Sequence, residues 1–283
     1  MNIPKYHYKF SKNKTCNTEN KKRIVSIDTE WAKNWKAEEK FIPFCACFHT
    51  VYIDTIIDVI NLNNIEMTSE LYFRGKNETS EEYVSNIDDI LGTYINNSTL
   101  FVGHQISSDL HSLSNSSKKL LSNVNLLIEN FRIRKEKIPF EELSIFDTRY
   151  DIKNRVVGDG GEKLRNVSLR YKVLAVQTEL DKMSLTNMYN KYLLDSDSIK
   201  REMLTVMNWR HAFQTSLIAL IDLLSPIHLF NEKYNRNFLL TNDIIFDMGK
   251  DSFVYLISEE YGKTCSIEEV QKYVTKYSKD LVL

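Results

Sequence analysis

The stretch Ile24-Val25-Ser26-Ile27-Asp28-Thr29-Glu30-Trp31 decides the fold that we expect for this chain. Its first four residues form a short, mostly apolar run, which predicts a buried β-strand. Side chains alternate between the two faces of a strand, so Asp28 and Glu30 should point to the same side at its end. Two carboxylates this close repel each other unless a positive charge lies between them. Mg²⁺ or Mn²⁺ suits such an oxygen-rich site, although two ordinary acids at a solvent-facing strand end are the plain alternative.

The composition is that of a globular protein. The 283 residues are enough for a substantial core, as one large domain or one domain with an appendage. No apolar run approaches the roughly 18 residues of a membrane span, and the N-terminus is polar, so we expect an intracellular protein, in the cytoplasm or the nucleus, without membrane association. The four cysteines lack zinc-site spacing, which indicates reduced thiols. With a net charge of −1, any site for a polyanion has to be a local patch.

Strand and helix patterns alternate along the first half of the chain. Apolar runs predict strands over residues 41–52, 65–73 and 99–102. Residues 79–95 have apolar side chains at helical spacing, with Thr79 or Ser80 as a cap and acidic residues in the first turn. This alternation predicts an α/β fold. Residues 1–22 combine lysines with aromatic residues, and we expect a basic N-terminal tail there.

A third acid follows the last of these strands. The segment Val102-Gly103-His104-Gln105-Ile106-Ser107-Ser108-Asp109-Leu110 leaves the strand through Gly-His and opens a helix with Asp109 in its first turn. A carboxylate at this place can face the Asp28/Glu30 strand across the end of the sheet. Taken alone, Asp109 is an ordinary acid at a helix start.

Together these motifs resemble the DEDD superfamily of 3′-to-5′ exonucleases. Ile27-Asp28-Thr29-Glu30, followed by Gly103-His104 and Asp109-Leu110, is similar to the first two family motifs. Ile145-Phe146-Asp147-Thr148-Arg149 resembles the family strand that ends in a structural Asp-Thr, and Lys163 to Tyr171 resembles the helix after it. The resemblance covers residues 23–225 and implies a ribonuclease H-like mixed sheet flanked by helices. We expect residues 226–283 to be a mostly helical C-terminal extension.

The last family motif departs from the pattern. The family has a metal-binding Asp on a helix, with a general-base His five residues earlier in the His subclass. His211 fits that His, but Ser216 stands at the position of the Asp. A neutral hydroxyl is a poor ligand. Asp222 lies about 9 Å further along such a helix, too far to substitute, and we expect it to be a solvated helix acid.

The resemblance implies a metal-dependent 3′-to-5′ exonuclease acting on single-stranded RNA or DNA ends with two Mg²⁺ or Mn²⁺ ions. Asp28 would bridge both ions, Glu30 would bind one and orient the water, Asp109 would hold the second, and His211 would take the proton of the water. Ser216 leaves three outcomes open: activity with water or phosphate filling the gap, a chain deliberately inactivated at this position, or an inactive exonuclease-fold protein. The inactive protein would bind nucleic acid or act as a scaffold.

Further side chains are candidates for contact with nucleic acid. Trp31 directly follows Glu30 and could stack on a terminal base, or could be a buried anchor beside the strand. Basic residues surround the loop at 158–161, where they could hold phosphates or line a solvated helix face. The candidates for this role are Trp31, His104, Arg149, Lys163 and Arg165.

Overall fold

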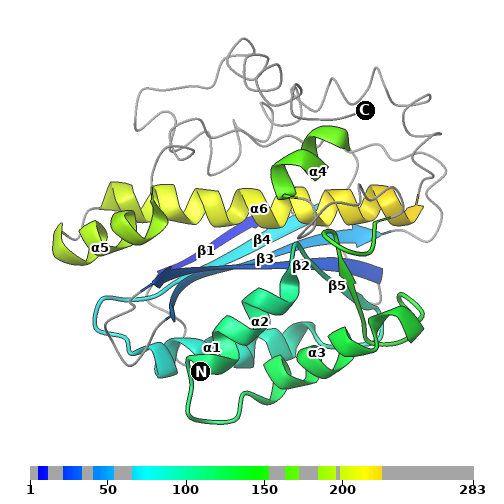
Figure 1. Ribbon diagram of the computed structural model, residues 1–283, viewed down its shortest axis with the longest axis horizontal. Helices are drawn as coiled ribbons and strands as arrows, with labels where there is room; N and C mark the ends of the chain where they lie inside the picture. The colour runs from blue at the N-terminus through cyan, green and yellow to red at the C-terminus, as the bar shows by residue number, and fades with distance from the viewer. Residues whose placement is uncertain are drawn as a thin grey trace.

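The computed structural model describes residues 6–11, 22–33, 41–53, 66–152, 163–171, 184–195 and 198–224. Within these segments, one mixed sheet has the strand order β1-β4-β3-β2-β5-β6 (Figure 1). The strands are β1 (Tyr6–Ser11), β2 (Lys22–Lys33), β3 (Phe41–Ile53), β4 (Glu66–Phe73), β5 (Thr99–Gly103) and β6 (Ser144–Asp147). β2 lies inside the sheet, antiparallel to β3 on one side and parallel to β5 on the other.

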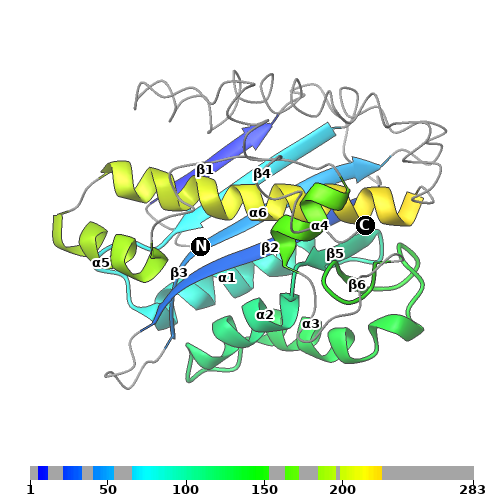
Figure 2. The same ribbon diagram turned by 45° about the horizontal axis from the view of Figure 1, so that its top comes forward.

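Helices cover both faces of this sheet. They are α1 (Ser80–Tyr94), α2 (Ile106–Asn115), α3 (Ser122–Arg132), the 3-10 helix η1 (Arg134–Glu136), α4 (Leu164–Arg170), α5 (Leu185–Asp195) and α6 (Ser198–Leu224). The long helix α6 crosses one face, with α4 and α5 on the same side, and α1, α2 and α3 lie on the opposite face (Figures 1 and 2). The expected α/β fold, a mixed sheet flanked by helices, is therefore confirmed.

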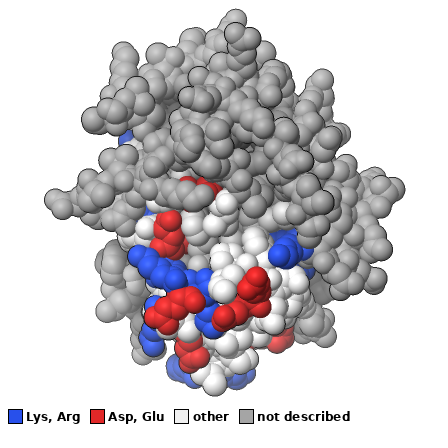
Figure 3. All heavy atoms as spheres, turned by 90° about the vertical axis from the view of Figure 1, so that its right-hand side faces the viewer, with Lys and Arg blue, Asp and Glu red and all other residues white. Residues whose placement is uncertain are grey.

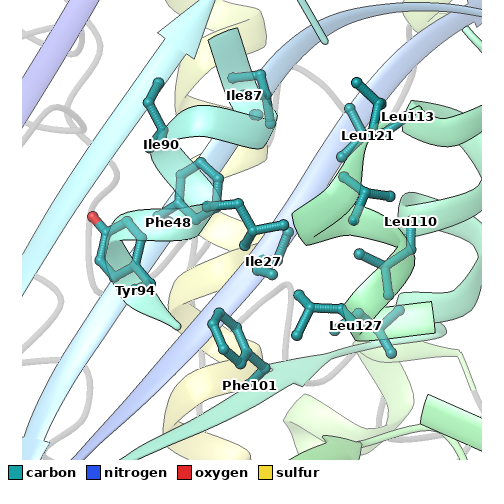
Figure 4. Packing of buried hydrophobic residues seen from close by; sticks show 14 of the residues in the cluster. Ile27, Phe48, Ile87, Ile90, Tyr94, Phe101, Leu110, Leu113, Leu121 and Leu127 are labelled. Carbon is teal, nitrogen blue, oxygen red and sulfur yellow. The ribbon is translucent and has the colours of Figure 1, made fainter. Parts of the chain in front are cut away.

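Side chains that alternate along β2 pack into two hydrophobic clusters, one on each face of the sheet. Ile24 joins the buried cluster under α6, whereas Val25 and Ile27 join the cluster under α1, α2 and α3. In the second cluster the strands supply large apolar side chains that pack against three helices (Figure 4). Its members include Ile27, Phe48, Phe101, Ile87, Leu110 and Leu127. Both faces of β2 are buried, so the register of this strand is firmly fixed.

Helix α1 begins as its sequence predicts. The Thr79 hydroxyl accepts a hydrogen bond from the backbone N–H of Glu82 at 3.2 Å, and the Glu82 carboxylate accepts one from the backbone N–H of Thr79 at 2.9 Å. This reciprocal pair satisfies donors that a helix start otherwise leaves open.

The structure adds elements that the sequence patterns did not reveal. Residues 6–11, within the expected basic tail, form the edge strand β1 and pair antiparallel with β4. The helices at 122–132 and 185–195 were not predicted either. The expected C-terminal extension, residues 226–283, lies outside the described residues. In the described segments, no helix combines the length and the apolar character that crossing a membrane requires.

Candidate metal centre

Asp28 and Glu30 lie where β2 continues past the end of β5. The parallel ladder between the two strands ends at the pair of Ser26 and Val102. Open α/β sheets place ligand sites at the carboxyl ends of strands, where the chain connections diverge. The ladder between β2 and β3 changes register between Glu30 and Trp31. Such bulges are common beside active sites because they redirect side chains.

Asp28, Glu30 and His211 meet at this end of the sheet. Each residue offers one potential ligand atom, and these atoms all lie within 4.8 Å of one another. His211 Nδ1 is 3.2 Å from Glu30 Oε1 and 3.5 Å from Asp28 Oδ2. The His211 side chain is 29% exposed, against 15% for Asp28 and 11% for Glu30, so the cluster is reachable from solvent on the imidazole side. The oxygen and nitrogen atoms of this cluster are suited to hold a divalent cation.

The charges in the cluster depend on one another. Burial alone would lower the pKa of His211, but Asp28 and Glu30 outweigh burial and raise it to about 9. Burial, together with the charge of Asp28, raises the pKa of Glu30. A protonated imidazole therefore balances the two carboxylates at neutral pH. A divalent cation held by the same carboxylates would supply this charge instead and would favour neutral imidazole, the form that a base or a ligand needs.

Asn208 is a site residue that the sequence analysis missed. Its Nδ2 donates a hydrogen bond to Asp28 Oδ2 at 2.6 Å. The side chain is fully buried, and its Oδ1 has no hydrogen-bond partner in the part of the chain that the structure describes. Asn208 and His211 stand three residues apart on α6, which places them on one side of the helix. The available signal was an asparagine, a poor helix former, inside a largely apolar helix.

Asp109 reaches the end of β2 from the other face of the sheet. Its Oδ1 accepts hydrogen bonds from the Thr29 backbone N–H at 3.1 Å and from the Thr29 hydroxyl at 2.8 Å. Thr29 separates Asp28 from Glu30, so this contact fixes Asp109 beside the cluster. Burial, and then the charge of Asp28, raises the pKa of Asp109 well above its usual range. Among the described residues, the three-membered ligand group does not itself include Asp109.

The turn from β5 into α2 is tightly constrained. A Cβ at Gly103 would lie 2.4 Å from Ile106 Cβ, so a larger residue does not fit there. Gln105 adopts a positive φ of 67°, the left-handed region. Asp147 at the end of β6 accepts hydrogen bonds from the backbone N–H groups of Gln105 at 2.9 Å and Ile106 at 3.1 Å. These contacts fit the structural role expected of Asp147.

Ser216 points away from the carboxylates of β2. It is fully buried, its Oγ lies 2.8 Å from Nδ1 of His49 on β3, and its hydroxyl donates to the Phe213 carbonyl at 2.9 Å. Five residues along an α-helix rotate a side chain by about 140° and advance it by about 7.5 Å. His211 therefore faces β2 while Ser216 faces β3.

Asp222 is not the solvated acid that the sequence suggested. Only 1% of it is exposed, and its carboxylate accepts a hydrogen bond from the Tyr171 hydroxyl. The expectation was wrong because the end of α6 is covered by α4 and the residue after it. Asp222 has a structural partner there, far along the helix from the cluster.

Two of the nucleic-acid candidates, His104 and Arg149, connect the β5–α2 turn to the segment that follows β6. His104 Nδ1 lies 3.0 Å from the Thr148 hydroxyl. The Arg149 guanidinium donates to the side-chain carbonyl of Gln105. Each side chain thus has a partner across this junction, which helps to position α2.

The other three candidates lie nearer to solvent. Trp31 is partly exposed and meets the Phe41 ring edge-on, with 6.5 Å between ring centroids. Lys163 and Arg165 are exposed at the start of α4. On the face that Figure 3 shows, the described lysines and arginines are interspersed with acidic side chains. That face gives no support to an extended phosphate-binding surface.

Comparison with family models, with curated proteins and with solved structures gave no match to this chain. The geometry of the Asp28, Glu30 and His211 cluster and its neighbours is therefore the guide to function.

Proposed function

We propose that this chain is a metal-dependent phosphodiester hydrolase, a 3′-to-5′ exonuclease that acts on single-stranded RNA or DNA ends. The observation that carries the proposal is the cluster itself: Asp28, Glu30 and His211 offer ligand atoms within 4.8 Å of one another, from two elements far apart in sequence. Asp109, held by Thr29, lies beside them. These are the acids that the DEDD resemblance assigns to metal binding.

The order of the strands supports a ribonuclease H-like architecture. β2 carries the first two acids inside the sheet, β3 and β4 form an antiparallel meander on one side, and β5 and β6 add in parallel on the other. Asp109 then arises at the first helix after β5. A sheet of this kind brings acids from two crossover-linked strands to one end.

In this proposal two Mg²⁺ or Mn²⁺ ions would hold the attacking water and stabilise the departing 3′ oxygen. Asp28 and Glu30 would hold the first ion, and Asp109 with Asp28 the second. Asn208 would keep the Asp28 carboxylate oriented through its 2.6 Å hydrogen bond. Two roles are open to His211, which would either take the proton of the water or bind the cation directly.

One observation favours a second candidate, an inactive exonuclease-fold protein that binds nucleic acid or acts as a scaffold. The ligand group found among the described residues contains two carboxylates and an imidazole, and Ser216 is buried against β3 rather than placed at the cluster. A protein that only binds a strand needs no fourth carboxylate.

The test is degradation of 5′-labelled single-stranded RNA and DNA with Mn²⁺ or Mg²⁺. We expect a ladder that shortens from the 3′ end, disappears in Asp28→Asn and Glu30→Gln, and persists in Asp89→Asn, which changes an exposed acid of α1. A substrate with a blocked 3′ end should resist. Degradation that survives in Asp28→Asn would reject the assignment. Strand binding without degradation by the unaltered protein would favour the inactive alternative.

A further inference from the structure

We infer that His211 is a direct metal ligand through Nδ1, and that the site consequently takes a transition ion such as Mn²⁺, Co²⁺ or Zn²⁺ in preference to Mg²⁺. The inference rests on the proposed function, because it concerns the cation of that same site.

The separations between the atoms suit a single coordination sphere. Ligand atoms that lie about 2.1 Å from one ion are about 3.0 Å apart at right angles and about 3.4 Å apart in a tetrahedron. His211 Nδ1 is 3.2 Å from Glu30 Oε1 and 3.5 Å from Asp28 Oδ2. The ligand oxygens of Asp28 and Glu30 lie within 4.8 Å of each other, so a modest rotation of one carboxylate would let one ion contact all three atoms.

The position of the imidazole also favours a ligand over a base. A general base has to lie within hydrogen-bonding reach of the water that it activates. Nδ1 of His211 instead lies within 3.5 Å of a carboxylate oxygen of both Asp28 and Glu30. Nδ1 of His211 is therefore the atom through which α6 would bind the cation.

On the stretch of α6 that follows His211, no acid comes before Asp222. Asp222 itself is bonded to Tyr171. An imidazole therefore stands where an all-oxygen site would have a third carboxylate. Mg²⁺ prefers oxygen ligands and retained water, whereas imidazole suits Zn²⁺ and its neighbours in the transition series. Replacing a carboxylate by a neutral imidazole also removes one negative charge, which weakens the attraction for a hard cation.

Asn208 provides a second, independent observation. It is fully buried and donates to Asp28 Oδ2 at 2.6 Å, while its Oδ1 has no partner among the described residues. A buried carbonyl without a partner costs about 1–3 kcal/mol. A leucine would avoid that cost if the position served packing alone. The amide has a function if it orients Asp28 for a metal, because hydrogen bonds from outside the coordination sphere orient the ligands in metal sites.

The first experiment measures binding directly, on the full chain. Co²⁺ is added while its visible absorption is recorded, and Mn²⁺ is added while pulsed paramagnetic resonance detects coupling to imidazole nitrogen. We expect a nitrogen-coupled Mn²⁺ signal, and we expect roughly 100-fold excess Mg²⁺ to leave Co²⁺ bound. Mg²⁺ that displaces Co²⁺ at equal concentration, or Mn²⁺ without nitrogen coupling, would overturn the inference.

A substitution that should reverse the metal preference tests the role of His211. His211→Asp makes the site all-oxygen, so Co²⁺ affinity should fall by at least about tenfold and Mg²⁺ should now compete. The matched control is His111→Asp, because His111 is exposed on α2 with Nδ1 near the Ser107 carbonyl, and it should bind both ions as the unaltered chain does. Unchanged Co²⁺ affinity in a folded His211→Asp variant would contradict the inference. If this variant fails to fold, the nitrogen coupling of the unaltered chain decides.

The strand assay with each ion separates this inference from the proposed function. Co²⁺ held through nitrogen, with no strand degraded under any ion, would uphold the metal site and reject the exonuclease. Degradation from the 3′ end that is equally efficient with Mg²⁺, together with Mg²⁺ displacing Co²⁺, would uphold the exonuclease and reject the selectivity.

Discussion

Asp109 Oδ1 accepts both hydrogen bonds that Thr29 can donate, from its backbone N–H at 3.1 Å and from its hydroxyl at 2.8 Å. The contact joins α2 to β2 between the two acids of the strand. The contact is buried, so water cannot replace a hydrogen bond that is lost there. The position of the third acid relative to Asp28 and Glu30 therefore depends on this threonine.

Thr29→Val removes the hydroxyl and keeps the shape of the side chain. We expect the free energy of unfolding to fall by about 1–2 kcal/mol, because a buried carboxylate loses one of its donors. Thr93→Val is the control, since Thr93 is exposed and its hydroxyl donates to the Ile90 carbonyl of its own helix. Urea unfolding of both variants measures the difference. Equal losses would show that the Asp109 contact contributes nothing particular.

Gly103→Ala should displace the start of α2. The added methyl would meet Ile106 Cβ at 2.4 Å. The Ile106 N–H donates to the Asp147 carboxylate and the Gly103 carbonyl accepts from the Thr148 N–H, so neither residue can move away freely. We expect a loss of about 1–3 kcal/mol. Gly92→Ala is the matched control, because the atom nearest to its methyl is the terminal Nδ2 of the Asn123 side chain, at 2.9 Å, rather than the branched Cβ of a residue in the same turn, and alanine favours the helix. Thermal unfolding compares the two, and a Gly103→Ala variant as stable as Gly92→Ala would contradict the close approach.

The sequence predicted those features that depend on local pattern. The strand bearing Asp28 and Glu30, and the cap of α1 at Thr79, follow from alternation and from capping chemistry between near neighbours. The rotation of α6 about its own axis does not follow from such local patterns. The described side chains of that helix are buried on nearly all sides, and among them no polar face marks which residues meet β2. A five-residue spacing then indicated Ser216, while packing placed Asn208 beside His211.

Ser216→Asp is consequently expected to give no gain in metal binding or strand degradation. The new carboxylate would be buried beside His49, and we expect a loss of about 3 kcal/mol or more in the free energy of unfolding. Ser216→Ala, which introduces no charge, should cost about 1 kcal/mol. Chemical unfolding and the strand assay test both variants. Activity that appears only in Ser216→Asp would mean that this residue reaches the cluster after all.

His49 makes stability depend on pH. Burial lowers its pKa to about 3, and its neighbours in the core are Ser216 and the Phe213 ring. The unfolded chain binds a proton on His49 below about pH 6.5, whereas the folded chain does not until about pH 3. Protonation of His49 therefore does not reduce the free energy of unfolding above pH 6.5. Between pH 6.5 and about pH 3 this free energy falls as the pH falls, with a slope approaching ~1.4 kcal/mol per pH unit.

The variant His49→Gln removes this titration. Urea unfolding between pH 7.5 and pH 5 should show a shallower loss of stability in the variant than in the unaltered chain, since other groups titrate in both. Identical slopes would show that His49 is protonated in the folded protein.

Asn208→Leu separates the support of Asp28 from the packing of α6. The substitution removes the 2.6 Å hydrogen bond to Asp28 Oδ2 and also the Oδ1 atom that has no partner in the described segments. We expect Co²⁺ affinity to fall by roughly 10- to 100-fold, as for other outer partners of metal ligands, while thermal stability is kept or rises. Asn130→Leu is the control, because Asn130 donates to the Leu126 carbonyl of its own helix in an exposed contact. Metal affinity that is unchanged in Asn208→Leu would show that the amide does not orient Asp28. A large loss of stability with intact metal binding would assign Asn208 to packing instead.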